Sequence, residues 1–171
     1  MYAIWITPPS VSNAILSSAI RFFLTDREQV NRPHITLLPS FRTKLELDEL
    51  RKMMDEFVAT RKSFKIGLEA FTVFSRGVNK LSVAMNVGYN HNRLVTLHDH
   101  LIAHFGATID ANWLPDFTPH LTLAKNRDEE HVKSITNMLH QAQLALRFEC
   151  TGLVLVELDT SDSHYSPFPR S

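Results

Sequence analysis

The chain has 171 residues, of which 44% are hydrophobic and 21% charged, as expected for a soluble globular protein that buries a single core. Lys and Arg together number 18, as do Asp and Glu, so there is no net field that would draw the whole molecule onto a polyanion or an acidic membrane. The single cysteine, Cys150, excludes an intramolecular disulfide and a C-x-x-C metal site.

The first half of the chain predicts the order strand, helix, strand, helix, strand. Residues 2–7 are rich in aromatic and β-branched types and end at Pro8 and Pro9, which is typical of a strand. A helix with an apolar face follows over residues 11–22, and Ser10 or Ser12 can cap it.

The next strand starts at His34. It is about five residues long, because Pro33 and Pro39 bound it. Apolar residues at helical spacing then predict a helix over residues 47–61, and a long strand follows over residues 63–74.

The second half repeats this order after a turn at residues 75–79. Its predicted elements are a strand at 80–87, a helix at 94–105, a strand at 120–124, a helix at 132–142, one long strand at 146–158 and a terminal strand around Tyr165. We therefore predict an α+β fold in one domain made of two pseudo-symmetric halves, at about residues 1–76 and 77–171. In this duplicated, two-lobed fold, antiparallel sheets line a central cleft and the helices pack outside.

Both halves contain the pattern Pro-His-aliphatic-Thr-Leu in their second strand. Strand side chains alternate between faces, so His34 and Thr36 point the same way, as do His120 and Thr122. Two histidines facing one point can act as a neutral base and a protonated acid, and two hydroxyls can stabilise the charge on a phosphate. This combination fits phosphodiester cleavage without a metal. Neither motif has an Asp or Glu cluster beside it, which argues against a two-metal site.

The stretches "PHITL" and "PHLTL", which place His34 and His120 86 positions apart, resemble the paired His-x-Thr motifs of the 2H phosphoesterase superfamily. The opening "YAIWITPP" is similar to its cyclic phosphodiesterase and 2',5' RNA ligase-like branches. The resemblance implies hydrolysis of a ribose cyclic phosphate or cleavage of a 2',5' linkage. It also implies that His34 and His120 are the catalytic pair and that Thr36 and Thr122 bind the phosphate.

Further residues are candidates for contact with the substrate. Phe41, Trp113 and Lys125 lie near the motifs, in segments that we expect to be loops at the rim of the cleft. The closing stretch "SHYSPF" resembles the last strand of the family, which implies that Tyr165 approaches the cleft.

Several alternatives remain open at this point. Small 2',3'-cyclic nucleotides, RNA ends or ADP-ribose cyclic phosphate are candidate substrates, and the neutral charge favours the small ones. A 2',5'-oligonucleotide phosphodiesterase or RNA ligase is a second possibility, and a non-catalytic module that binds nucleotides or RNA ends is a third. The spacing does not assign the base and the acid between the two histidines.

We expect a monomer that needs no cofactor and no obligate protein partner. We also expect it to be cytoplasmic and not bound to a membrane, because no stretch resembles a signal peptide or a membrane span. His100 and His104 lie one helical turn apart, a spacing that can bind zinc, but without the glutamate of an H-E-x-x-H motif they favour a solvated polar face.

Overall fold

The computed structural model describes residues 1–10, 12, 14, 18, 33–75, 81–109 and 117–169. The strands in chain order are β1 (Tyr2–Ile6), β2 (Ile35–Phe41), β3 (Phe64–Ser75), β4 (Leu81–Val87), β5 (His120–Arg127), β6 (Leu146–Cys150), β7 (Gly152–Glu157) and β8 (Ser163–Pro167). The helices are α2 (Leu47–Ala59), α3 (His91–Phe105) and α4 (Glu129–Ala142). None of these helices is long and apolar enough to cross a membrane.

The helices form where the apolar periodicity predicts them. In α2 the buried residues Leu50, Met54 and Phe57 follow helical spacing, and a capping box between Glu46 and Glu49 satisfies the first turn. The described positions of the predicted helix at 11–22, which are Ser12, Ala14 and Ser18, have helical backbone, as does Ser10 before it. Its predicted apolar face, formed by Val11, Ile15, Ala19 and Phe22, lies outside the described residues.

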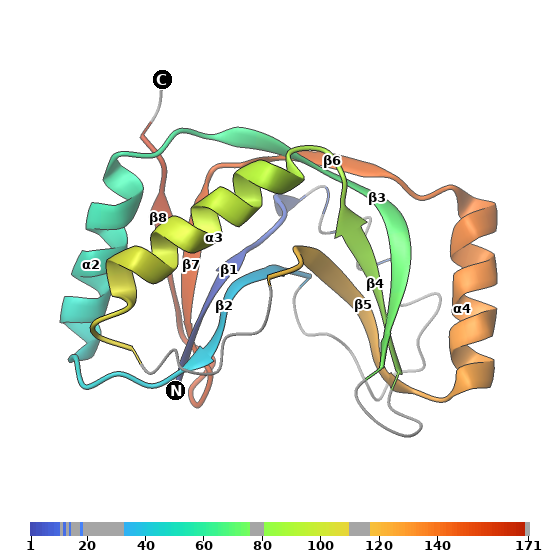
Figure 1. The fold of residues 1–171 in the computed structure, drawn as a ribbon, viewed down its shortest axis with the longest axis horizontal. Coiled ribbons are helices and arrows are strands. Elements are labelled where there is room, and N and C mark those ends of the chain that lie inside the picture. Colours follow the sequence, from blue (N-terminus) through green and yellow to red (C-terminus); the bar gives the residue numbers. More distant parts are fainter. Residues whose placement is uncertain are drawn as a thin grey trace.

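All the described strands belong to one eight-stranded sheet with the order β6-β3-β4-β5-β2-β1-β7-β8, and every pairing is antiparallel. The predicted α+β class is therefore confirmed, with the two predicted sheets joined into one. The join is the pairing of β2 with β5, so the two strands that carry the repeated motif are neighbours at the centre of the sheet (Figure 1).

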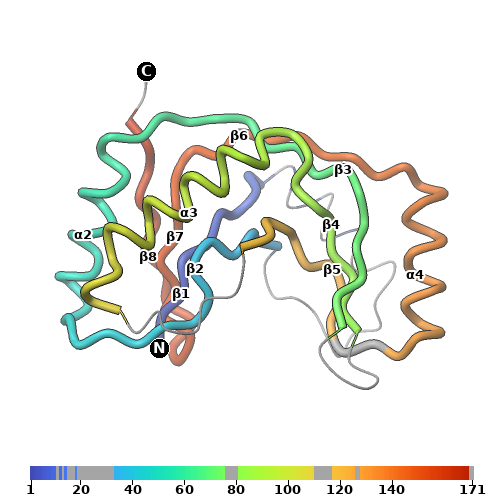
Figure 2. Tube along the Cα trace, viewed as in Figure 1, coloured from blue at the N-terminus to red at the C-terminus, as the bar shows by residue number. Residues whose placement is uncertain are grey.

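The sheet has two lobes on either side of this join. The first lobe contains β1, β2, β7 and β8, and α2 and α3 pack on its outer side, whereas the second contains β3 to β6 with α4 outside (Figure 2). Residues on the helix-facing side, such as Ile35 and Leu121, are 0% exposed and belong to the hydrophobic core. A functional site on β2 and β5 would therefore lie on the opposite face of these two strands.

Two strand predictions need correction. The stretch 146–158 is two strands, because the chain crosses at Thr151 from β6 beside β3 to β7 beside β1. Gly152 makes this crossing possible, since a Cβ there would collide with the Ser166 carbonyl and the Tyr165 ring. Likewise, β2 does not stop at Pro39, because the proline sits where the pairing with β1 shifts register, and strands tolerate proline at such bulges.

Candidate active site

The two His-x-Thr motifs meet where β2 pairs with β5. Ile35 lies directly opposite Leu121 in this antiparallel pair. Continuing the register by one residue in each direction places His34 opposite Thr122 and Thr36 opposite His120. Opposite residues of an antiparallel pair have Cβ atoms about 5 Å apart, so the four side chains form a compact group. All four lie on the face away from the core, because Ile35 and Leu121 point into it.

An aromatic ring supports each of the two histidines. The Trp5 ring of β1 stacks on the His34 imidazole, with centroids 3.8 Å apart and an angle of 13° between the planes. The Phe74 ring of β3 lies against the His120 imidazole at 4.6 Å and 40°. Such contacts restrict how each imidazole can rotate. Trp5 and Phe74 could not be singled out from the sequence, because only the strand register shows which residues lie beside the motifs.

A backbone contact determines which nitrogen of His120 can react. Its Nδ1 lies 2.7 Å from the carbonyl oxygen of Thr118. A carbonyl only accepts hydrogen bonds, so Nδ1 carries the hydrogen and Nε2 is the nitrogen that can exchange a proton. In the neutral ring Nε2 accepts a proton, and in the charged ring it donates one.

Strand β4 adds polar groups next to β5. Asn86 lies opposite His120, and its Nδ2 donates to Thr72 Oγ1 at 2.5 Å. The Asn86 Oδ1 and Ser82 Oγ atoms are buried and have no hydrogen-bond partner among the described residues. Buried polar groups are nearly always paired, so these two are candidates for contact with a ligand or an ordered water. The alternation of "LSVAMNV" could have suggested them, because Ser82 and Asn86 interrupt an apolar strand on one face.

Lys125 lies in β5 and not in a loop. The step in pairing from Thr122 to Ala124 covers two residues of β5 but only one residue of β4, so β5 contains an extra residue there. Leu123 and Ala124 are accordingly both buried, with 4% and 1% exposed. A bulge of this kind shifts the alternation, which brings the half-buried Lys125 onto the same face as Thr122.

The other candidate residues have different outcomes. Phe41 is 2% exposed and packs in the core, 6.0 Å from the Tyr2 ring, so the expectation that it contacts the substrate is wrong. Its ring turns inward because it is the last residue of β2 and not part of a rim loop. Tyr165 in β8 is 49% exposed, and its hydroxyl lies 2.9 Å from Thr151 Oγ1. Trp113 lies outside the described residues.

A family model described as the 2'-5' RNA ligase superfamily matches residues 7–162, which is most of the chain. The chain belongs to this superfamily. The membership confirms the resemblance to the 2H phosphoesterases that the paired motifs indicate. No curated protein matches the chain significantly.

Solved structures similar to this member of the superfamily cover it almost completely. TT0787 of Thermus thermophilus has a TM-score of 0.63 at 17% identity, over 98% of this chain and 94% of that one. LigT of E. coli, solved with 3'-AMP, has a TM-score of 0.57 at 14% identity, over 99% and 95% of the two chains. Usb1 of Kluyveromyces marxianus has a TM-score of 0.57 at 11% identity, over 98% and 97%. At these identities the likeness shows a shared fold.

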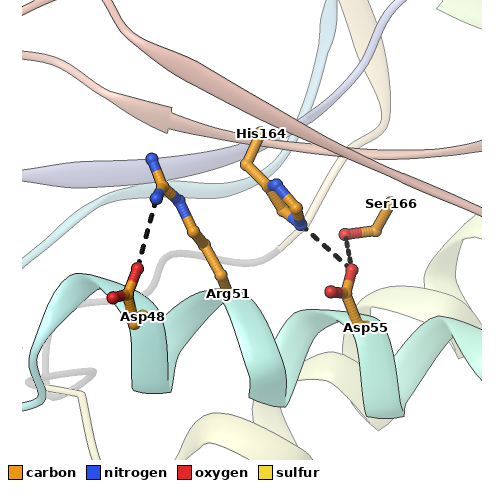
Figure 3. Close-up of polar contacts among 5 residues, drawn as sticks. All are labelled: Asp48, Arg51, Asp55, His164 and Ser166. Atoms are coloured by element: carbon orange, nitrogen blue, oxygen red, sulfur yellow. Dashed lines mark hydrogen bonds and ion pairs between the residues drawn. The ribbon is translucent and has the colours of Figure 1, made fainter.

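On the opposite side of the sheet, the protein has a second cluster of side chains of the kinds that occur in active sites. Asp55 of α2 accepts hydrogen bonds through the same oxygen, Oδ1, from His164 Nε2 at 3.0 Å and from Ser166 Oγ at 2.6 Å (Figure 3). In a nucleophilic triad the serine bonds to the histidine, whereas here both donate to the carboxylate. The group therefore fastens β8 to α2 and does not activate a nucleophile.

Asp55→Ala is expected to lower the melting temperature at pH 7 by about 3 °C. The two bonds to this half-exposed carboxylate stabilise the fold by about 1 kcal/mol in total. Partial burial raises the pKa of Asp55, but the bonds from Ser166 and His164 outweigh this and hold the pKa below its usual value. The stabilisation is therefore present above the unfolded pKa of about 4 and is lost as the pH falls through the folded pKa.

Thermal unfolding of both proteins at pH 7 and at about pH 2.5 checks this expectation. The difference in melting temperature should become smaller at the lower pH. Glu56→Ala, which removes an exposed carboxylate from the same helix, is the matched control and should change little at either pH. An equal difference for Asp55→Ala at both pH values would contradict the assignment.

Proposed function

We propose that the protein is a metal-independent phosphodiesterase that hydrolyses ribose cyclic phosphates, with His34 and His120 as its acid and base. The substrates are 2',3'-cyclic nucleotides, RNA ends that carry the same group, or ADP-ribose cyclic phosphate. The observation that carries this proposal is the Ile35–Leu121 pairing, whose register supports two imidazoles and two hydroxyls around one phosphate. We place the activity in a cytoplasmic monomer, in line with the single free cysteine, Cys150.

In the proposed reaction one neutral histidine takes a proton from water as the water oxygen attacks phosphorus. The other histidine, protonated, gives its proton to the ribose oxygen as the bond between that oxygen and phosphorus breaks. The product is a phosphomonoester with a free ribose hydroxyl, and the two histidines have exchanged protonation states. At His120 the reacting atom is Nε2, because Thr118 holds Nδ1.

The remaining groups act on the phosphate and on the orientation of the pair. The hydroxyls of Thr36 and Thr122 donate to the non-bridging oxygens and stabilise the charge that develops there. Lys125 adds a positive charge on the same face. Trp5 and Phe74 keep the imidazoles directed at the phosphate.

Contacts with the nucleoside are also part of the proposal. The Asn86 Oδ1 atom, to which no described residue donates, would accept a hydrogen bond from a ribose hydroxyl. The exposed Tyr165 ring would contact the base at the outer end of the first lobe. Trp113 is proposed as a further contact on the basis of the sequence alone.

A second candidate function is hydrolysis or ligation at a 2',5' linkage between nucleotides. The description of the matched family as the 2'-5' RNA ligase superfamily favours it. The same acid and base would serve, because a 2',5' linkage is also a phosphodiester with a ribose oxygen as leaving group.

A substrate panel tests the proposal. Purified protein is incubated, with a chelator present, with 2',3'-cyclic nucleotides, ADP-ribose cyclic phosphate and 2',5'-oligoadenylate, and the products are separated by chromatography. We expect phosphomonoesters from at least one cyclic phosphate. Turnover of the 2',5'-oligoadenylate alone would instead support the second candidate. Inactivity on all substrates, combined with measurable binding, would show a nucleotide-binding module.

A further inference from the structure

A pocket lies at the far end of β2 from the histidines. It has a volume of about 560 Å³, within the range of small-ligand sites, and is lined by Arg42, Thr43, Lys44, Leu45, Ala107, Thr108 and Ile109. Its walls are the segment that leaves β2 toward α2 and the segment that leaves the end of α3 (Figure 1). It is therefore separate from the site at the centre of the sheet.

Hydrogen bonds fasten the two walls to each other. Thr43 forms an antiparallel bridge with Ile109, and its hydroxyl donates to the Thr108 carbonyl at 2.8 Å. The same hydroxyl accepts from the backbone N–H of Leu45 at 3.1 Å. The Thr108 hydroxyl donates to the Phe105 carbonyl at 2.8 Å. The pocket is thus built from paired backbone that can hold a defined shape.

The pocket combines positive charge with apolar surface. Among the described residues, Arg42 and Lys44 are the only ionisable ones that line it, and neither forms an ion pair with another described residue. On the wall that follows β2, the acidic side chains Glu46 and Glu49 are engaged in the capping box of α2. Two cations beside the apolar side chains of the lining suit a ligand that carries both a phosphate and a flat base.

The position of the pocket relates it to the histidines. Arg42 directly follows β2, and His34 directly precedes it, so at a rise of about 3.3 Å per residue they are separated by roughly 25 Å along the strand. A mononucleotide cannot span that length. About seven stacked nucleotides can, at the roughly 3.4 Å rise of one strand.

We propose that this pocket binds a phosphate-bearing nucleotide of an RNA strand whose cyclic phosphate end lies at the two histidines. The inference rests on the proposed function and narrows it to RNA ends as the preferred substrate class. The balanced charge by itself favours small substrates, but a chain that grips RNA at two separate points does not need a continuous basic surface.

The test compares two substrates with and without the two cations. Arg42→Ala/Lys44→Ala is assayed on an eight-nucleotide RNA that ends in a 2',3'-cyclic phosphate and on a 2',3'-cyclic mononucleotide. We expect KM for the RNA to rise about tenfold with kcat unchanged, and no change for the mononucleotide. The slope of log KM against log salt should fall by about 0.7, since one phosphate contact is lost. The control Lys62→Ala/Lys133→Ala removes two exposed cations elsewhere and should leave both substrates unaffected.

Two results would overturn the inference while leaving the proposed function in place. One is an unchanged KM for the RNA in the pocket variant, and the other is an equal rise for the control variant. If the wild type turns over neither substrate, the proposed function is wrong, and a binding measurement then tests the role of the pocket independently. Fluorescence anisotropy then uses a labelled octanucleotide with a 3'-phosphate as the probe. Weaker binding by the pocket variant than by wild type and control supports the pocket, and equal binding by all three refutes it.

Discussion

Replacing His34 or His120 with alanine is expected to lower kcat for a 2',3'-cyclic nucleotide by about 10³-fold, with KM changed by less than about threefold. Each substitution removes one of the two proposed proton transfers, and a positioned acid or base contributes about 10²–10⁴ in rate. The double variant should be little slower than either single one, because the two groups act in the same step. Steady-state release of the phosphomonoester measures all three variants.

The control for this experiment is His100→Ala, which removes an exposed imidazole from α3. It should keep the wild-type kcat. Thermal unfolding of every variant shows whether the fold is intact. If either His34→Ala or His120→Ala keeps more than a tenth of the wild-type kcat, the acid–base assignment of that residue is wrong.

Phe41→Ala is expected to destabilise the fold by about 3–5 kcal/mol, measured by urea unfolding. The ring is 2% exposed and lies in the core, so its removal leaves a cavity that the neighbouring side chains fill only in part. Phe41→Leu keeps most of the volume and should cost less than about 1.5 kcal/mol. If Phe41 contacted the substrate instead, the alanine variant would raise KM and leave stability unchanged.

The fold could be predicted from the sequence as far as local patterns determine it. Helix α2 was predictable because Leu50, Met54 and Phe57 keep one period over the whole element. The break at Thr151 was harder to predict, because β-type residues lie on both sides of it and the change of sheet neighbour ends the strand. Gly152 is the one local signal, since an isolated glycine in a strand pattern often marks a bend. Phe41 was misjudged for a related reason, since a bulge lets β2 continue past Pro39.

Some residues of the candidate site could likewise be predicted from local sequence patterns, and others could not. The duplicated motif marks His34 and His120 and places both on equivalent strands, which is local information. Trp5 and Asn86 become neighbours of the motifs only through the register between strands far apart in the chain. Lys125 is a candidate because it lies near the second motif in the sequence, but its location on the face of Thr122 depends on the bulge in β5, which no short pattern indicates.

The pairing of β1 with β7 has a consequence for how the polypeptide folds during synthesis. Tyr2 lies opposite Glu157, and Phe64 of β3 likewise lies opposite Cys150 of β6. A nascent chain on the ribosome therefore cannot complete either lobe until almost all of it has emerged. Such non-local pairings form slowly, and the waiting edges of β1 and β3 are exposed to aggregation in the meantime.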